Sequence, residues 1–218
     1  MKNEEIIDTL SEIKNLMERS SKVLSLNGTS SMIVGLLATV GGCLASYLLY
    51  GNFNPFNWNN VPSADSSENR IAMMVLAVIL VALSILIVFY MSYKRAKRLN
   101  IRFELDSVMK KMLTTFFVPL IIGGLLCLTQ IFNGVYSCVA SNMLIFYGIS
   151  LISISSLTYS NVKYLVIGEI LVGLLDSLIV GHSLFFWLVG FGLLHILYGL
   201  WFLFFYEKKH QVNKTDER

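Results

Sequence analysis

Three ionisable side chains lie in apolar parts of this chain and could carry chemistry: Glu169, Asp176 and His195. The stretch "GEILVGLLDSLIVGH", residues 168–182, holds both carboxyl groups, seven residues apart. Seven residues of α-helix turn through about 700°, so the two carboxyl groups share one helix face, roughly 10 Å apart along the axis. A charged group at the centre of a bilayer is costly, and it usually faces the interior of a helix bundle, where it finds a partner.

The partner that the sequence favours for Glu169 is His195, the only histidine inside an expected membrane span. A connection of a few residues joins the two segments, so we expect a tight antiparallel hairpin with Glu169 and His195 at similar depth. Gly173 lies on the face of Glu169, and Gly192 and Gly199 flank His195, so we expect these glycines where the two spans meet. Further candidate partners are polar side chains of the neighbouring spans: Thr129, Gln130, Ser150, Ser153, Ser155 and Ser156.

Three interpretations of this intramembrane polar site remain open. In the first, a protonated carboxyl group is hydrogen-bonded to a neighbour and holds the bundle together. In the second, the group belongs to a proton or ion pathway, or to a polar ligand pocket. In the third, Glu169, Asp176 and His195 bind a metal. A single histidine is a thin basis for a transition-metal site, so we predict no metal and no cofactor.

The elements that position these residues follow from the distribution of charge. The chain is 55% hydrophobic and only 14% charged, whereas a soluble domain carries about 25% charged residues. The charges gather in blocks, and the apolar stretches between them can each span a bilayer. We predict an all-α polytopic membrane bundle of six spans plus an N-terminal amphipathic helix. The expected spans are Ser30–Tyr50, Ile71–Tyr93, Met112–Phe132, Tyr136–Thr158, Val162–Val180 and Leu184–Tyr206.

Lysine and arginine set the expected orientation. With six spans, the basic residues of the N-terminal segment, of the loop between spans two and three, and of the tail all fall on one side, and only Arg70 falls on the other. The side rich in lysine and arginine is cytoplasmic. The first 29 residues are rich in acidic residues and lack an apolar core, so we expect no cleavable signal peptide. The predicted organisation is a cytoplasmic helix at 1–29, a transmembrane domain at 30–206 and a cytoplasmic tail at 207–218.

Two cytoplasmic elements and one helix groove could bind partners. Apolar residues of the N-terminal segment recur every three or four positions, as in a helix that lies on the membrane, docks on the loops or pairs with a second copy. The basic segment 94–111 favours an anchor to anionic lipid over a protein-docking site. Ala38, Gly42 and Ser46 form a small-residue groove suited to another helix, within the chain or in a homo-oligomer.

Residues 12–42, "EIKNLMERSSKVLSLNGTSSMIVGLLATVGG", resemble the opening of a group of uncharacterised multi-pass membrane proteins common in Bacteroidota. In that group a short charged amphipathic helix leads into a first span rich in glycine and alanine. Asn27 stands where that group would have a serine. The resemblance implies a bacterial inner-membrane location. Members are often encoded beside small winged-helix regulators, which implies a regulatory pairing.

The function classes that remain are both non-enzymatic. The chain lacks G-x-S-x-G, H-E-x-x-H, a phosphate-binding glycine-rich loop and C-x-x-C. Its net charge of +3 is too small to indicate nucleic-acid binding. We expect an integral membrane protein with a regulatory or scaffold role, coupling the membrane to a cytoplasmic partner. The alternative is a small transporter or channel that uses the region around Glu169 and His195.

The orientation can be tested with reporter fusions. A reporter fused after residue 218 should be active on the cytoplasmic side, and the same reporter inserted within residues 51–70 should be active on the opposite side, because lysine and arginine stay in the cytoplasm. The same orientation at both positions would rule out six spans with cytoplasmic termini.

Overall fold

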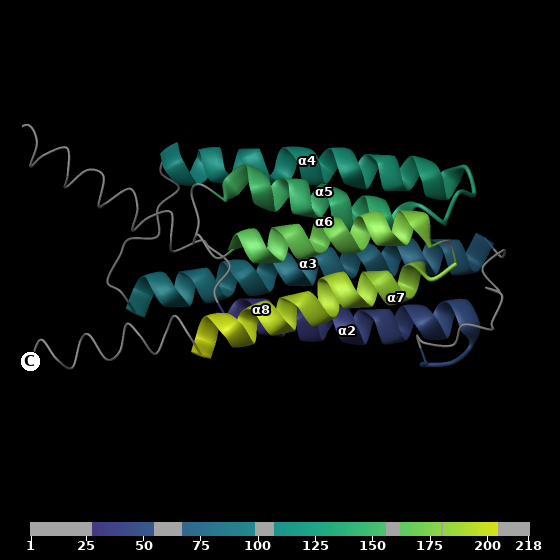
Figure 1. The fold of residues 1–218 in the computed structure, drawn as a ribbon, viewed down its shortest axis with the longest axis horizontal. Helices are drawn as coiled ribbons and strands as arrows, with labels where there is room; N and C mark the ends of the chain where they lie inside the picture. The colour runs from purple at the N-terminus through teal and green to yellow at the C-terminus, as the bar shows by residue number, and fades with distance from the viewer. Residues whose placement is uncertain (1–27, 55–66, 99–106, 156–161, 180, 205–218) are drawn as a thin grey trace, which may run out of the picture.

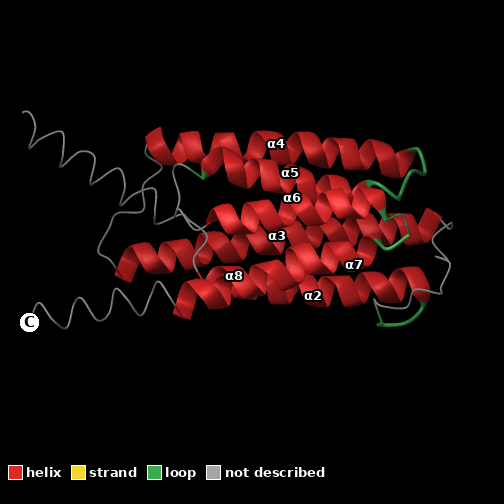
Figure 2. Cartoon of the chain, viewed as in Figure 1, coloured by secondary structure: helices red, strands yellow, loops and turns green. Residues whose placement is uncertain are grey.

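The computed structural model describes residues 28–54, 67–98, 107–155, 162–179 and 181–204. Secondary structure in this part of the chain is helical, with no strand (Figure 2). The predicted all-α class is therefore confirmed there. The N-terminal amphipathic helix and the tail at 207–218 lie outside the described residues, as do most of the outer loop and the centre of the basic segment.

Six helical rods run alternately up and down an elongated bundle (Figure 1). The last rod is continuous from Ser183 to Phe202 and is called the final helix below. It begins as α-helix, widens into a π-helical segment labelled η1 and returns to α-helix. The bounds are α2 Gly28–Tyr50, α3 Ser67–Arg98, α4 Ser107–Phe132, α5 Val139–Ile154, α6 Val162–Leu178, α7 Ser183–Trp187, η1 Leu188–Leu194 and α8 His195–Phe202.

Four of these rods are long and apolar enough to cross a membrane: α2, α3, α4 and the final helix. Helix α5 is apolar but has 16 residues, which at 1.5 Å per residue reach about 24 Å of a hydrocarbon core of roughly 30 Å. Helix α6 has 17 residues and carries Lys163, Glu169 and Asp176. The structure thus supports a membrane protein, and six spans stays a prediction.

Large apolar side chains cover the outside of the bundle, as lipid contact requires. Val78, Leu86 and Tyr90 on α3 are each about two-thirds exposed, at 67%, 64% and 66%. Leu178 and Phe132, at the ends of α6 and α4, are 78% and 75% exposed. Soluble monomers rarely expose contiguous apolar surface beyond a few hundred Å². A surface of this kind therefore indicates burial in a bilayer.

The packing order runs from α3 through α2, the final helix, α6 and α5 to α4. Helix α3 packs mainly on α2, and α4 packs mainly on α5. The most extensive partner of α6 is α5, and the most extensive partner of the final helix is α2. The expected hairpin of the fifth and sixth spans is thus looser than predicted, because each of the two helices packs more closely on another neighbour.

Glycines bring α2 and the final helix into backbone contact. A Cβ added to Gly28 would lie 2.8 Å from the carbonyl oxygen of Gly199, and one on Gly35 would lie 2.8 Å from that of Gly192. The expectation that Gly192 and Gly199 face the helix of Glu169 is wrong, because both face α2. Gly173 on α6 meets Leu144 and neighbouring residues of α5 instead.

The groove predicted on α2 is internal. Ala38 and Ser46 are buried, and Gly42 sits against Leu188 of the final helix. Gly28 and Gly35 continue this contact with the final helix, whereas Gly41 meets Leu80 of α3, so the small residues of α2 serve contacts within the chain. The alternative of a groove for a second copy does not apply to these residues.

The glycine contact predicts a large difference between two alanine substitutions. Gly35→Ala should lower the free energy of unfolding by about 1–3 kcal/mol, because the new methyl group would overlap backbone that cannot rotate away. Gly124→Ala on α4 is the matched control, since a Cβ there meets no atom within 4 Å. Unfolding of both variants in mixed detergent micelles measures the difference. Equal stabilities would contradict the close approach of α2 and the final helix.

Candidate functional site

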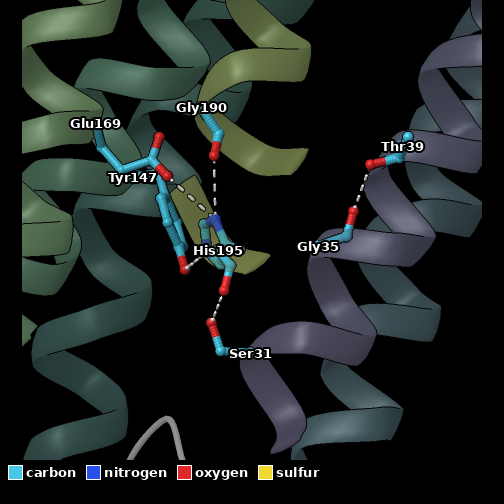
Figure 3. Close-up of polar contacts among 7 residues, drawn as sticks. All are labelled: Ser31, Gly35, Thr39, Tyr147, Glu169, Gly190 and His195. Carbon is cyan, nitrogen blue, oxygen red and sulfur yellow. Dashed lines mark hydrogen bonds and ion pairs between the residues drawn. The ribbon is translucent and has the colours of Figure 1, made fainter. Parts of the chain in front are cut away.

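The structure brings Glu169 and His195 together in the middle of the bundle. Glu169 Oε1 on α6 lies 3.2 Å from His195 Nδ1 on the final helix (Figure 3). The two side chains are 0% and 1% exposed, so both groups face protein and not lipid. Glu169 also lies on the one buried face of α6, together with Gly173 and Asp176, as the spacing predicted.

The imidazole of His195 has partners on both of its nitrogens. Nδ1 faces two acceptors, the Glu169 carboxyl group and the backbone carbonyl of Gly190 at 3.3 Å. Nε2 lies 2.8 Å from the hydroxyl oxygen of Tyr147 on α5. Two acceptors at Nδ1 place the ring hydrogen there, so in the neutral imidazole Nε2 accepts a hydrogen bond from the Tyr147 hydroxyl. The three side chains form a series of polar contacts from α5 to α6: a hydrogen bond at Nε2 and an ion-pair contact at Nδ1.

The π-helical segment η1 positions this imidazole. His195 follows η1 directly; its backbone N–H donates to the carbonyl oxygen of Gly192, and its ring Nδ1 contacts that of Gly190, both within η1. A Cβ added to Gly190 would overlap the Leu144 side chain and lie 2.9 Å from Glu169 Oε2, so these side chains would have to shift to admit one. Single π turns within α-helices are frequent at functional sites. The widened turn therefore coincides with the polar network.

Ser31 of α2 forms a hydrogen bond with the backbone of His195. Its hydroxyl is buried and donates a hydrogen bond of 2.8 Å to the carbonyl oxygen of His195 (Figure 3). The glycine contacts of α2 with the final helix lie on both sides of this bond along the helix. Both the ring and the backbone of His195 are thus held, by elements that are distant in the sequence.

The glutamate of this network is incompletely satisfied. Within the described residues neither carboxyl oxygen of Glu169 makes a hydrogen bond of good geometry, and Oε1 has only the 3.2 Å ion-pair contact with His195. Oε2 is buried beside Gly190. A buried acceptor without a donor usually costs about 1–3 kcal/mol. The carboxyl group therefore has capacity for a further proton or donor.

Asp176 stays apart from this pair. It is fully buried two helical turns further along α6. The hydroxyl of Ser183 and the backbone of Ser141 approach its carboxyl group, but neither completes a hydrogen bond of good geometry, and the Ser183 hydroxyl donates to the carbonyl of Ser137. In the part of the chain that the structure describes, no three His, Cys, Asp or Glu side chains gather as metal ligands. The sequence predicted one site with three ionisable residues. The structure instead has the pair Glu169 and His195, with Asp176 buried separately.

The other polar side chains that the sequence offered do not join the network. Gln130 accepts a hydrogen bond of 2.9 Å from Asn142, near one end of α4 and α5. Thr129, Ser150 and Ser153 donate to carbonyl oxygens of their own helices, and Ser156 lies outside the described residues. Tyr147 is not among the partners that the sequence predicts. Its only signal was a tyrosine in the middle of an apolar segment, since span tyrosines usually gather at the membrane interface.

A cavity of about 500 Å³ adjoins the network. Tyr147 and His195 line it, whereas Glu169 lies behind the imidazole and does not. The other lining side chains are almost all apolar and come from α2, α3, α4, α5 and the final helix. The polar chain therefore presents one hydroxyl group and one imidazole edge to an apolar space.

No known protein family, curated protein or solved structure matches this chain. The chemistry of the site therefore has to be argued from its own geometry. A carboxyl group, an imidazole and a hydroxyl in series can pass or share a proton, because each pair lies within hydrogen-bonding reach.

Two substitutions of Glu169 test the contact. Glu169→Leu should lower the free energy of unfolding by about 1–3 kcal/mol, because it removes the charged acceptor of His195 Nδ1 and leaves only the long contact with Gly190. Glu169→Gln should be milder, since its amide oxygen can still accept. Unfolding in mixed micelles, read by circular dichroism, measures both. A Leu variant as stable as the Gln variant would show that the contact contributes nothing.

Proposed function

We propose that this chain is a six-span, non-enzymatic integral protein of a bacterial inner membrane, with a regulatory role that couples the membrane to a cytoplasmic partner. The start of α2 and the end of α8 lie together, since Gly28 contacts Gly199. An even number of spans with both termini on one side requires that arrangement. The likeness of residues 12–42 to a membrane protein group encoded beside winged-helix regulators supports the location and the role.

The observation that carries the proposal is the under-satisfied Glu169 beside His195. An ionisable group at the bilayer centre costs about 2.5–3.5 kcal/mol on insertion scales. A purely structural cross-link would complete the hydrogen bonds of the carboxyl group, and within the described residues neither oxygen of Glu169 makes a hydrogen bond of good geometry. The pair is therefore suited to a change of protonation, which supports a responsive element over a fixed one.

Protonation would rearrange hydrogen bonds across three helices. When the imidazole gains a proton, Nε2 becomes a donor to the Tyr147 oxygen. The hydroxyl hydrogen of Tyr147 then no longer points to the imidazole and can point towards the cavity. The final helix carries this imidazole, and Ser31 links the same residue to α2. We expect the change to reach the ends of α2 and the final helix, which adjoin the N-terminal segment and the tail where a cytoplasmic partner or a scaffold contact would form.

Transport is the second candidate, and the cavity favours it. Intramembrane ionisable groups mark proton pathways in secondary transporters, and here the imidazole of the pair borders a cavity. The cavity lining is apolar, however, with few groups that could carry an ion through it. A regulatory response needs no continuous path, and this difference favours regulation.

The proposal predicts a pH-dependent change in backbone protection. In lipid nanodiscs, hydrogen–deuterium exchange of α2 and α8 should change as the pH is lowered, because a proton added to the imidazole would rearrange its hydrogen bonds with Tyr147. The rates are to be corrected for intrinsic pH dependence. Glu169→Gln should abolish the change, and Asp176→Asn, a buried acid outside the network, should keep it. Loss of the change in the Asn variant alone would refute the assignment to Glu169.

The same variants separate regulation from transport. Reconstituted vesicles with an enclosed pH dye should hold an imposed proton gradient as long as empty vesicles do, if the protein only responds to protonation. Dissipation of the gradient by the wild type, abolished by Glu169→Gln, would establish the transport alternative in its place.

A further inference from the structure

The cavity beside the network has an aromatic wall. Trp187, Phe191 and His195 follow one another at intervals of four on the final helix, and all three line the cavity. Their rings lie in series: Trp187 and Phe191 are tilted, with centroids 5.4 Å apart, and Phe191 and His195 are stacked, with centroids 6.2 Å apart. Tyr147 adds a fourth ring, 5.3 Å from Phe191, and Phe116 of α4 adds a fifth. Offset and tilted rings at such distances can accept another planar ring.

One polar point lies within this wall. The Tyr147 hydroxyl is bonded to His195 Nε2, so the oxygen has a lone pair free when it donates to the imidazole and a hydrogen free when the imidazole is protonated. In the protonated state it is a donor for a carbonyl oxygen, and in the neutral state it is an acceptor for a hydroxyl group. The site can therefore pair with either form of an oxygen on a ring.

The rest of the cavity lining is almost entirely apolar, with Phe89 and Phe117 beside many aliphatic side chains. Helices α3 and α4 both line the cavity and have no extensive contact with each other in the described part of the chain, so we expect the cavity to open between them. Both helices also expose apolar side chains to lipid. The aliphatic lining includes Leu80, Val81, Ile85, Val88, Leu120 and Ile121.

We propose that this cavity binds a lipophilic molecule with a planar, oxygen-bearing ring and an apolar tail, the chemistry of a membrane quinone. The volume of about 500 Å³ lies within the range of ligand sites, roughly 300–1,000 Å³. The ring stacks on the aromatic wall, its oxygen pairs with the Tyr147 hydroxyl, and the tail leaves between α3 and α4. A simple acyl chain would use neither the wall nor the hydroxyl. The inference deepens the proposed function, since it names the occupant of the same site.

Trp187 supplies a local probe for the test. The chain has three tryptophans, so Trp58→Phe with Trp201→Phe leaves Trp187 as the only indole. The matched control is Trp58→Phe with Trp187→Phe, which leaves Trp201, a residue outside the cavity lining. Both proteins are titrated in micelles with a decyl-substituted benzoquinone, which quenches indole fluorescence on contact. We expect saturable quenching of Trp187, and only weak, linear quenching of Trp201.

Two further variants assign the binding to the cavity. Tyr147→Phe should raise the Kd roughly tenfold, the effect of one lost hydrogen bond in an apolar site. Gly124→Leu adds a side chain at a cavity-lining position with open space around it, and it should abolish saturation. Leu125→Phe is its control, since Leu125 is 58% exposed and does not line the cavity. Circular dichroism checks that each variant is folded.

The outcomes separate the ligand from the regulatory role. Equal, linear quenching of both tryptophans, or full binding by Gly124→Leu, would overturn the quinone site. Displacement of the quinone by decanol at equal concentration would show an alkyl-chain site and would also overturn it. If the quinone does not bind but the pH response is intact, only the ligand proposal is refuted. If the quinone binds but the pH response is absent, only the regulatory proposal is refuted.

Discussion

The contact between Glu169 and His195 is the constraint on which the rest of the interior depends. Neither group can face hydrocarbon without a penalty of several kcal/mol, so each has to be enclosed by helices. Enclosure is complete, since both side chains are essentially unexposed. To bring them within 3.2 Å, α6 and the final helix must meet at one level, although each of them packs more extensively on a different neighbour. The polar contact thus fixes the height along the bundle at which the pair of α2 and the final helix meets the pair of α5 and α6.

The final helix is where these requirements meet. Its glycines face two ways: Gly192 and Gly199 lie against α2, and Gly190 lies against Glu169 and Leu144. Residues two apart on a helix differ by about 200°, so Gly190 and Gly192 face opposite neighbours, whereas Gly192 and Gly199 share one face. The π-helical segment η1 carries both Gly190 and Gly192 and ends directly before His195. The ring of His195 contacts Glu169 while its carbonyl oxygen accepts from Ser31 of α2, so this residue joins the two sides of the rod.

The cavity follows from the same arrangement. Helix α3 is held by α2 and helix α4 by α5, so the chain of packed helices ends at α3 on one side and at α4 on the other. The space between these ends is apolar because most of the side chains that line it are apolar, and its polar corner is formed by Tyr147 and His195. A membrane protein can keep such an opening, since hydrocarbon and not water lies outside it.

The sequence by itself determined the class, the helices and the pair. Apolar stretches of span length predicted a helical membrane bundle, and the cost of a buried charge predicted that Glu169 would face His195. Only the tertiary structure decided which helices the glycines join, because a small residue permits close approach without naming the partner. It also decided that Asp176 stays apart and that Tyr147 completes the network. Spacing along one helix fixes a shared face, but contacts between helices depend on packing and on the π-helical turn, for which hydrophobic periodicity carries no signal.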